Sequence, residues 1–174
     1  MQAAQASETL PGVRLLEQTP IILEKLLHSA PQEVLQWKPA PDRWSISEVL
    51  AHLVDVEAMF SERVRRMVEE KSPHLPEFDE KAAQTKYSSG TAIEHLRKFC
   101  HERDRTVTML RYLPASAGAC TGQHAALGTI TLDQHMNEWA FHDLGHIRQI
   151  AELIRARKHW KQAGKLGESY QLKP

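Results

Sequence analysis

The sequence is poor in cysteine and has no long apolar run. Its 174 residues include only Cys100 and Cys120, which form no CxxC pair and fall far short of the cysteine density of a secreted disulfide scaffold. We therefore expect free thiols and a cytoplasmic location. No apolar stretch approaches the roughly 20 residues of a membrane helix, and the first ten residues lack a secretory-signal pattern. We expect the protein to be soluble and to have no membrane partner.

An excess of charge of either sign is also missing. The 22 basic residues balance the 22 acidic ones, and no run of lysines and arginines marks a nucleic-acid-binding face. We therefore expect no nucleic-acid partner. Histidine, in contrast, is abundant, with ten residues, and this is the first compositional indication of metal binding.

Strand-like alternation is too short to build a sheet, whereas four long stretches have helical periodicity. The predicted helices cover about 13–28, 46–67, 92–113 and 131–157. A capping box begins each of the last three, with the residue pairs Ser45 and Glu48, Thr91 and Glu94, and Thr131 and Gln134. We predict an all-α four-helix bundle with long connecting loops. It forms one domain over 1–174, with a helical core at 13–157 and a short C-terminal extension at 158–174.

The segment before the last helix is about fifteen residues long and contains Gly118, Gly122, His124 and Gly128. Loops of that length are uncommon in a compact domain unless they have a role. We therefore expect this segment to serve a purpose such as covering a site.

Two histidines of the predicted last helix, His142 and His146, lie four residues apart, so both imidazoles project from one helix face about one turn apart. Both lie at the margin of the apolar stripe, where bundles build metal sites. His135 shares that face but lies roughly 10.5 Å from His142 along the axis, too far to bind the same ion. A further ligand must come from another helix, and His52, at the border of the second helix's apolar stripe, is the best candidate. The alternative is that these histidines are core-edge groups with local hydrogen bonds.

Three neutral imidazoles with an open fourth position suit a divalent ion, foremost zinc or nickel, with iron and manganese as further options. Water in the open position would have a pKa near 7, or a substrate thiol could ionise there. Asp143, Asp55 and Glu57 are available to accept hydrogen bonds from the outer N–H groups of the ligands. A zincin protease is rejected, because no glycine after His146 turns the chain to bring Glu152 back to the metal.

These features together resemble the DinB-like superfamily, whose metal-binding four-helix bundles are also described as YfiT-like metal-dependent hydrolases. The resemblance extends over about 13–157. It is carried by the segment 43–53 with Asp55 and Glu57, by Tyr87, Arg105, His124 and Gly128, and by the segment 142–150 with its pattern HDxxHxxQ. It implies His52, His142 and His146 as metal ligands. It also implies a thiol-dependent S-transferase or isomerase that uses a low-molecular-weight thiol such as bacillithiol or mycothiol, or else a hydrolase.

Several functions remain open at this stage. The first is a metal-dependent enzyme that acts on a small-molecule substrate by thiol transfer or hydrolysis. The second is a non-catalytic metal-binding module for stress response or ligand binding, and the third is an interaction protein without metal. A homodimer through the first or third helix is a further expectation. Tyr87, Arg105 and His124 could shape a pocket or simply pack, and Gly145 could permit a close approach of a neighbouring helix.

Overall fold

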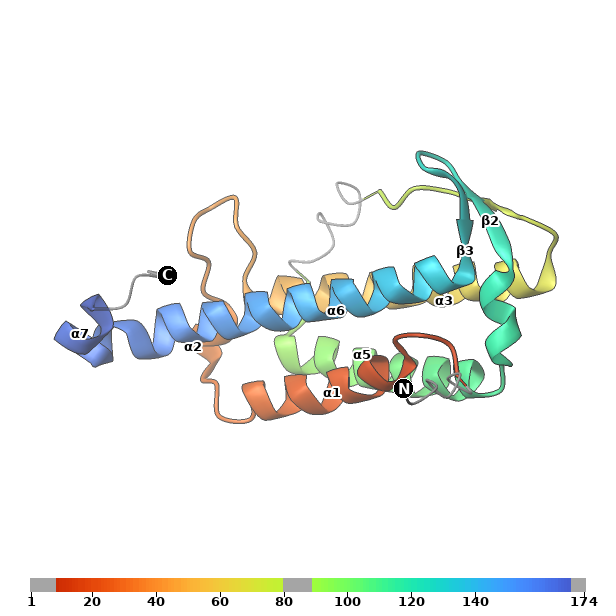
Figure 1. Cartoon of the computed structure of the whole chain (residues 1–174). Helices are drawn as coiled ribbons and strands as arrows, with labels where there is room; N and C mark the ends of the chain where they lie inside the picture. The colour runs from red at the N-terminus through yellow and green to blue at the C-terminus, as the bar shows by residue number, and fades with distance from the viewer. Residues whose placement is uncertain (1–8, 80–88, 170–174) are drawn as a thin grey trace, which may run out of the picture.

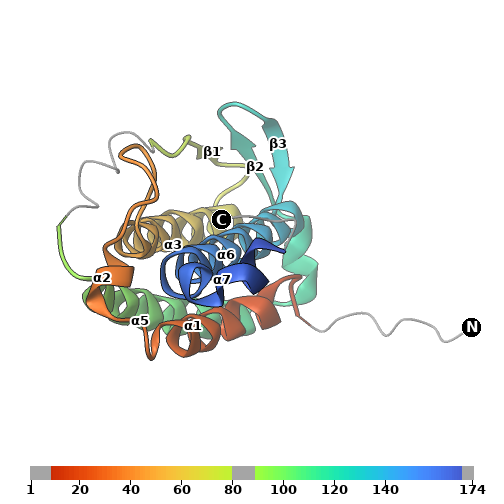
Figure 2. The ribbon, with the colours of Figure 1, turned by 90° about the vertical axis from the view of Figure 1, so that its left-hand side faces the viewer.

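The computed structural model describes residues 9–79 and 89–169. Four long helices dominate it: α1 (Val13–Leu27), α3 (Ile46–Glu69), α5 (Ala92–Arg111) and α6 (Leu132–Ile154). They form a four-helix bundle, as Figures 1 and 2 show. The predicted all-α bundle is therefore confirmed. No helix in the described ranges is long and apolar enough to cross a membrane.

Three of the long helices begin where the sequence predicted. Ser45, Thr91 and Thr131 are the N-caps of α3, α5 and α6, and each forms the predicted capping box with the residue three positions on. In α3, the Ser45 hydroxyl accepts a hydrogen bond from the Glu48 amide at 3.2 Å, and the Glu48 carboxylate accepts one from the Ser45 amide at 2.7 Å. Two backbone donors of the first turn are thus satisfied.

The helices follow an unusual path around the bundle. Seen from its end, α3 lies beside α5 and α6, and α1 lies beside the same two helices on the opposite corner (Figure 2). The chain leaves α3 at one end of the bundle and enters α5 at the other, so α3 and α5 run in the same direction (Figure 1). In contrast, α3 and α6 are antiparallel neighbours. The first half of α3 therefore faces the second half of α6.

Apolar side chains from all four helices fill the interior. The largest, Trp139 of α6, is fully buried, and Phe99 of α5 and Leu50 of α3 are equally inaccessible. Burial of such side chains removes a large apolar area from water and is the main force that holds helices together in a bundle. The predicted inward positions of α6 are confirmed for Leu132, Met136, Trp139 and Ile150, which are all buried.

A small sheet lies at the end of the bundle where α3 and α5 finish, and the prediction that the chain forms no sheet was wrong. Strand β1 (His74–Leu75) pairs in parallel with β2 (Thr121–His124), and β2 pairs antiparallel with β3 (Gly128–Thr131). Strands of two to four residues are too short to produce a recognisable alternation. The segment predicted as a long linker is thus a 3-10 helix, η1 (Ala115–Ala119), followed by a β-hairpin.

Short elements complete the structure. A four-residue helix, α2 (Gln32–Leu35), follows α1. At the other end of the chain, a π-helical turn, η2 (Arg155–His159), continues α6 into α7 (Trp160–Glu168). The predicted extension from residue 158 is therefore more helical than expected.

Candidate metal centre

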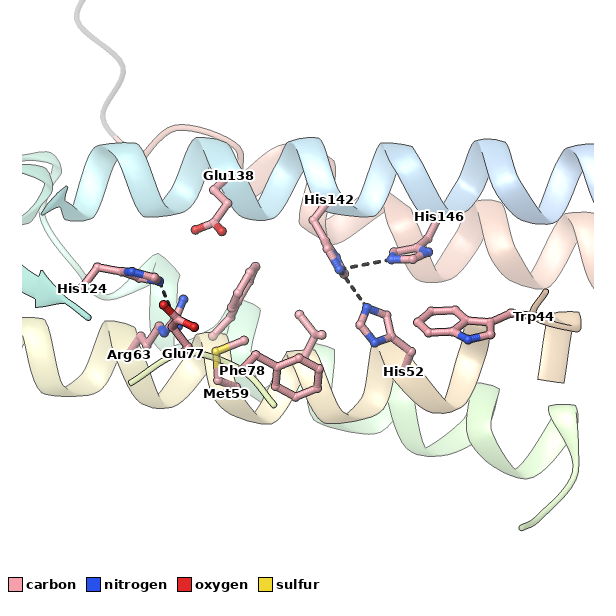
Figure 3. A pocket seen from close by; sticks show the side chains of 12 residues that line it. Trp44, His52, Met59, Arg63, Glu77, Phe78, His124, Glu138, His142 and His146 are labelled. Atoms are coloured by element: carbon pink, nitrogen blue, oxygen red, sulfur yellow. Dashed lines mark hydrogen bonds between the residues drawn. The ribbon is translucent and has the colours of Figure 1, made fainter. Parts of the chain in front are cut away.

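The three histidines selected from the sequence converge at one point between α3 and α6 (Figure 3). The Nε2 atom of His142 lies 3.1 Å from Nε2 of His52 and 3.1 Å from Nε2 of His146. His52 comes from the first half of α3 and the other two from the middle of α6, and the contact of these antiparallel helices brings them together.

The hydrogen bond of His146 with Gln149 determines which of its ring nitrogens carries the hydrogen. Its Nδ1 lies 2.9 Å from the side-chain oxygen of Gln149, one turn further along α6. An amide oxygen only accepts hydrogen bonds, so Nδ1 carries the hydrogen and Nε2 presents a lone pair to the other two rings. Gln149 thereby fixes the ring orientation and tautomer that a metal ligand needs.

Burial keeps two of the three imidazoles, those of His52 and His142, neutral. His52 is only 6 % exposed, and burial, together with the neighbouring His146 and His142, lowers its pKa to about 3. Burial also lowers the pKa of His142 to about 4, with His146 as the next cause. Neutral imidazole is the form that binds a metal ion, so protons do not compete for these rings near neutral pH.

The donor set fits a divalent cation. His142 Nε2 faces two other Nε2 atoms, and a single N–H hydrogen could satisfy only one of these two contacts. Ligands of a tetrahedral or octahedral ion with bonds of about 2.1 Å lie about 3.0 to 3.4 Å apart. The 3.1 Å separations agree with that spacing. Three converging lone pairs repel one another, whereas a cation at their centre would attract all three.

A cavity of about 460 Å³ extends from the three histidines along the groove between α3 and α6. At the histidine end, Trp44 stacks near His146 with ring centroids 6.4 Å apart, and Phe78 contacts the edge of His52 at 5.7 Å. The opposite end is polar and contains Arg63, Glu138 and His124 (Figure 3). The volume is that of a small-molecule site. His124 therefore lines a cavity, in line with the role expected of its segment.

Arg103 is a buried residue that the sequence reading missed. Its guanidinium donates to Glu57 at 2.8 Å and to Asp143 at 2.6 Å, and all three side chains are 1 % exposed. Thr19 of α1 donates to the same Asp143 carboxylate at 2.7 Å. This network joins four helices directly beneath His142. A signal existed, because Arg103 falls on the apolar stripe of α5 between Phe99 and Leu110.

This network changes the prediction of which side chains accept hydrogen bonds from the outer N–H groups of the three histidines. Asp143 and Glu57 bind Arg103 rather than an imidazole N–H, and no hydrogen bond among the described residues joins Asp55 to an imidazole. An isolated sequence cannot show this, since a carboxylate beside a histidine on a helix points about 100° away from it. Gln149, three residues beyond His146, is the acceptor observed.

The other candidate residues have different outcomes. His135 is fully buried, and its ring contacts the Phe60 carbonyl and Glu138, each at 3.2 Å, so it lies apart from the three histidines as expected. Arg105 does not line the cavity, because its side chain is 70 % exposed and pairs with Glu102. Gly145 permits no close approach, since a side chain there would enter open space. Tyr87 lies outside the described residues.

Comparison with known proteins decides the family. A sequence profile of the DinB superfamily matches residues 15–150, which include the three histidines. The chain belongs to the DinB superfamily. Its relatives include a protein of Oceanobacillus iheyensis named "putative metal-dependent hydrolase", which is 25 % identical over 148 residues, 83 % of this chain and 84 % of the relative.

A solved structure has the same architecture as this DinB protein. It is YfiT from Bacillus subtilis, described as a probable metal-dependent hydrolase with an unusual four-helix bundle topology. The match has a TM-score of 0.78 and covers 89 % of this chain and 90 % of YfiT, with 21 % identity. At that identity the comparison establishes the shared fold. The parallel pair of α3 and α5 is consistent with the unusual topology described for YfiT.

Proposed function

We propose that this DinB protein is a divalent-metal-dependent enzyme that activates a nucleophile, water or a thiol, against a small-molecule substrate. The observation that carries the proposal is the convergence of the Nε2 atoms of His52, His142 and His146 at one end of a 460 Å³ cavity. When bound there, a divalent ion acts as a Lewis acid and lowers the pKa of a nucleophile in its remaining position. Zinc and nickel suit three imidazoles best.

The chain's own residues hold the site and restrict its access to water. Gln149 fixes the tautomer of His146, and Trp44 and Phe78 place aromatic rings against His52 and His146. These rings cover one side of the three histidines, so the cavity is their open side. A substrate therefore reaches them along the groove between α3 and α6, past Met59 and Phe60.

The protein's own thiols do not line this cavity. Burial raises the pKa of Cys100 to about 11, and the carboxylate of Glu24 adds to this effect, so Cys100 is a poor nucleophile. Neither Cys100 nor Cys120 is among the residues that surround the cavity. A thiol that takes part in the reaction must therefore come from a co-substrate, such as the low-molecular-weight thiols bacillithiol and mycothiol that the family resemblance implies.

The metal site is tested by metal analysis of protein purified without a nickel column. We expect one equivalent of a divalent metal, and we expect His52→Ala, His142→Ala and His146→Ala each to lose it. His135→Gln is the matched control, because it alters a buried histidine of the same helix and should leave the metal content unchanged. Absence of metal in the unaltered protein after loading with zinc, nickel, iron and manganese would contradict the proposal.

The reaction is tested with the metal-loaded protein and small electrophiles. Metal-dependent adduct formation with bacillithiol or mycothiol would establish thiol transfer, whereas turnover of esters or amides without added thiol would establish hydrolysis. His142→Ala should abolish either activity. A metal-loaded protein that does neither would favour the non-catalytic binding module.

A further inference from the structure

The two buried arginines of the described structure, Arg103 and Arg63, differ in their contacts with carboxylates. Arg103 is 1 % exposed and is neutralised by two carboxylates. Arg63 is 5 % exposed and lines the cavity, yet no carboxylate of the described residues lies within 4 Å of it. Its Nη2 donates to the Pro76 carbonyl at 2.7 Å, and its Nε has no partner in the described chain. The charge of Glu138 acts on Arg63 from across the cavity without direct contact. A buried guanidinium that no carboxylate touches is costly, so an anionic ligand in contact with Arg63 would stabilise it.

His124, which lies beside Arg63, has no acceptor for its Nε2 hydrogen among the described residues. His124 Nδ1 accepts a hydrogen bond from the backbone amide of Ala126 at 3.2 Å, so that nitrogen carries no hydrogen. In a neutral imidazole the hydrogen is then on Nε2, and His124 Nε2 lies 3.4 Å from Nη2 of Arg63. Both atoms are donors, and the contact is therefore not a hydrogen bond. One N–H group from α3 and one from the β-hairpin thus lie side by side, and no acceptor among the described residues lies between them.

We propose that Arg63 and His124 form an anion-binding subsite that takes the carboxylate of the substrate at the end of the cavity away from the three histidines. A carboxylate oxygen can accept from both donors, and a planar guanidinium matches a carboxylate well. The charged Arg63 and the neutral donor His124 together suit a ligand group with a single negative charge. Glu138 and Glu77, which line the same end of the cavity, disfavour a doubly charged phosphate (Figure 3).

Glu138 does not fill the subsite itself. Its carboxylate lies 3.2 Å from Nδ1 of His135, and the hydrogen bond with His135 is the main cause that lowers its pKa. The other ring nitrogen of His135 lies 3.2 Å from the Phe60 carbonyl, so the imidazole lies between two acceptors. Glu138 is thus engaged by α6, while its charge opposes an anion at Arg63 from across the cavity.

The location of the subsite restricts the substrate class. On α3, Arg63 follows His52 by eleven residues, or roughly 16 Å between α-carbons. This inference rests on the proposed function: the substrate has its reacting group at the histidines and a carboxylate several bonds away. Short metabolites such as acetate esters cannot engage both ends, whereas a medium-chain acid can.

The first experiment observes Arg63 directly. NMR of its Nε–H is recorded on the full chain supplied with one equivalent of Zn²⁺, during titration with hexanoate and, separately, with hexanamide. We expect a saturable shift with hexanoate and none with the amide. Equal responses, or none with hexanoate, would overturn the subsite. Zinc content is measured on the same sample, so a failure of the metal site is seen independently of a failure of Arg63.

The second experiment connects the subsite to the histidines. Two hydroxamates of equal chain length, one ending in a carboxylate and the other in a primary amide, are compared by calorimetry over chains of four to ten carbons. We expect the carboxylate to bind at least tenfold more tightly at one intermediate length and to lose that preference in the shortest chains. A preference that does not depend on chain length would contradict the geometry.

Variants identify the residues responsible. Arg63→Met should remove the carboxylate preference, Arg63→Lys should keep part of it, and Glu138→Gln should strengthen it. Arg65→Met is the matched control, since Arg65 is a solvent-facing arginine of the same helix. If Arg63→Met does not fold, His124→Phe on the hairpin supplies the test and should lower the preference severalfold. An unchanged preference in folded Arg63→Met, or in His124→Phe in its place, would refute the assignment.

Discussion

At the scale of single residues, the hydrogen-bond partners of each imidazole separate roles that their sequence positions do not. Nδ1 of His146 donates its hydrogen to Gln149, so its Nε2 carries none, whereas Nδ1 of His124 accepts from Ala126 and its Nε2 carries the hydrogen. The first arrangement presents a lone pair and the second presents a donor. The first arrangement suits the proposed cation at one end of the cavity, and the second suits the proposed anion at the other.

Gln149 provides a test of this difference. Gln149→Ala leaves the Nδ1–H of His146 without its acceptor, and loss of such a partner weakens metal binding by about 10- to 100-fold. We expect that loss in zinc affinity, measured by competition with a chromophoric chelator. Arg148→Ala, an exposed neighbour on α6, is the control and should bind zinc as the unaltered protein does. Equal affinities would show that Gln149 does not orient the ligand.

At the scale of the helices, Arg103 of α5 links α1, α3 and α6 through its hydrogen bonds to the Leu16 carbonyl, Glu57 and Asp143. Arg103→Met leaves the carboxylates of Glu57 and Asp143 buried without a cation, and breaking a buried ion pair in this way costs about 3–5 kcal/mol. Denaturant unfolding should show this loss. The control is Arg105→Met two residues on, whose exposed side chain should change stability by no more than about 0.5 kcal/mol. Similar effects of the two substitutions would contradict the role of the network.

The sequence predicted the helices better than the contacts between them. Capping boxes are local signals, so the starts of α3, α5 and α6 could be identified from three residues each. The approach of His52 to His142 was inferred from stripe positions and the family resemblance. The partners of Asp143 and the unpaired state of Arg63 depend on side chains distant in sequence, and periodicity carries no information about them.

At the scale of the whole molecule, the buried histidines affect stability in mild acid. Burial lowers the pKa of His52 to about 3 and that of His142 to about 4, from an ordinary value of 6.5. Below about pH 6.5 the unfolded chain therefore binds protons that the folded protein does not, and the free energy of unfolding of the metal-free protein falls towards pH 4. Above pH 6.5 these groups contribute no slope. His52→Gln should reduce the slope measured by denaturant unfolding between pH 6.5 and 4.5, and an unchanged slope would be contrary evidence.

A bound metal should also raise the stability of the whole chain. A ligand that binds only the folded state at 100 times its Kd stabilises it by about 2.7 kcal/mol. We expect the Tm to rise when zinc is added to chelator-treated protein and to stay constant in His142→Ala. A Tm that does not respond to zinc in the unaltered protein would mean that the folded chain has no strong site.

The path of the chain through the bundle has a consequence for folding. Of the long helices, α1 and α3 are on diagonal corners, as are α5 and α6, and the consecutive pair that packs side by side, α3 with α5, is parallel. No two long helices can therefore dock as a local hairpin before the rest of the chain arrives. Contacts between helices must close long segments, which raises contact order, and high contact order slows folding. We therefore expect slower refolding than in an up-and-down bundle of equal length, with helix docking as a late and concerted step.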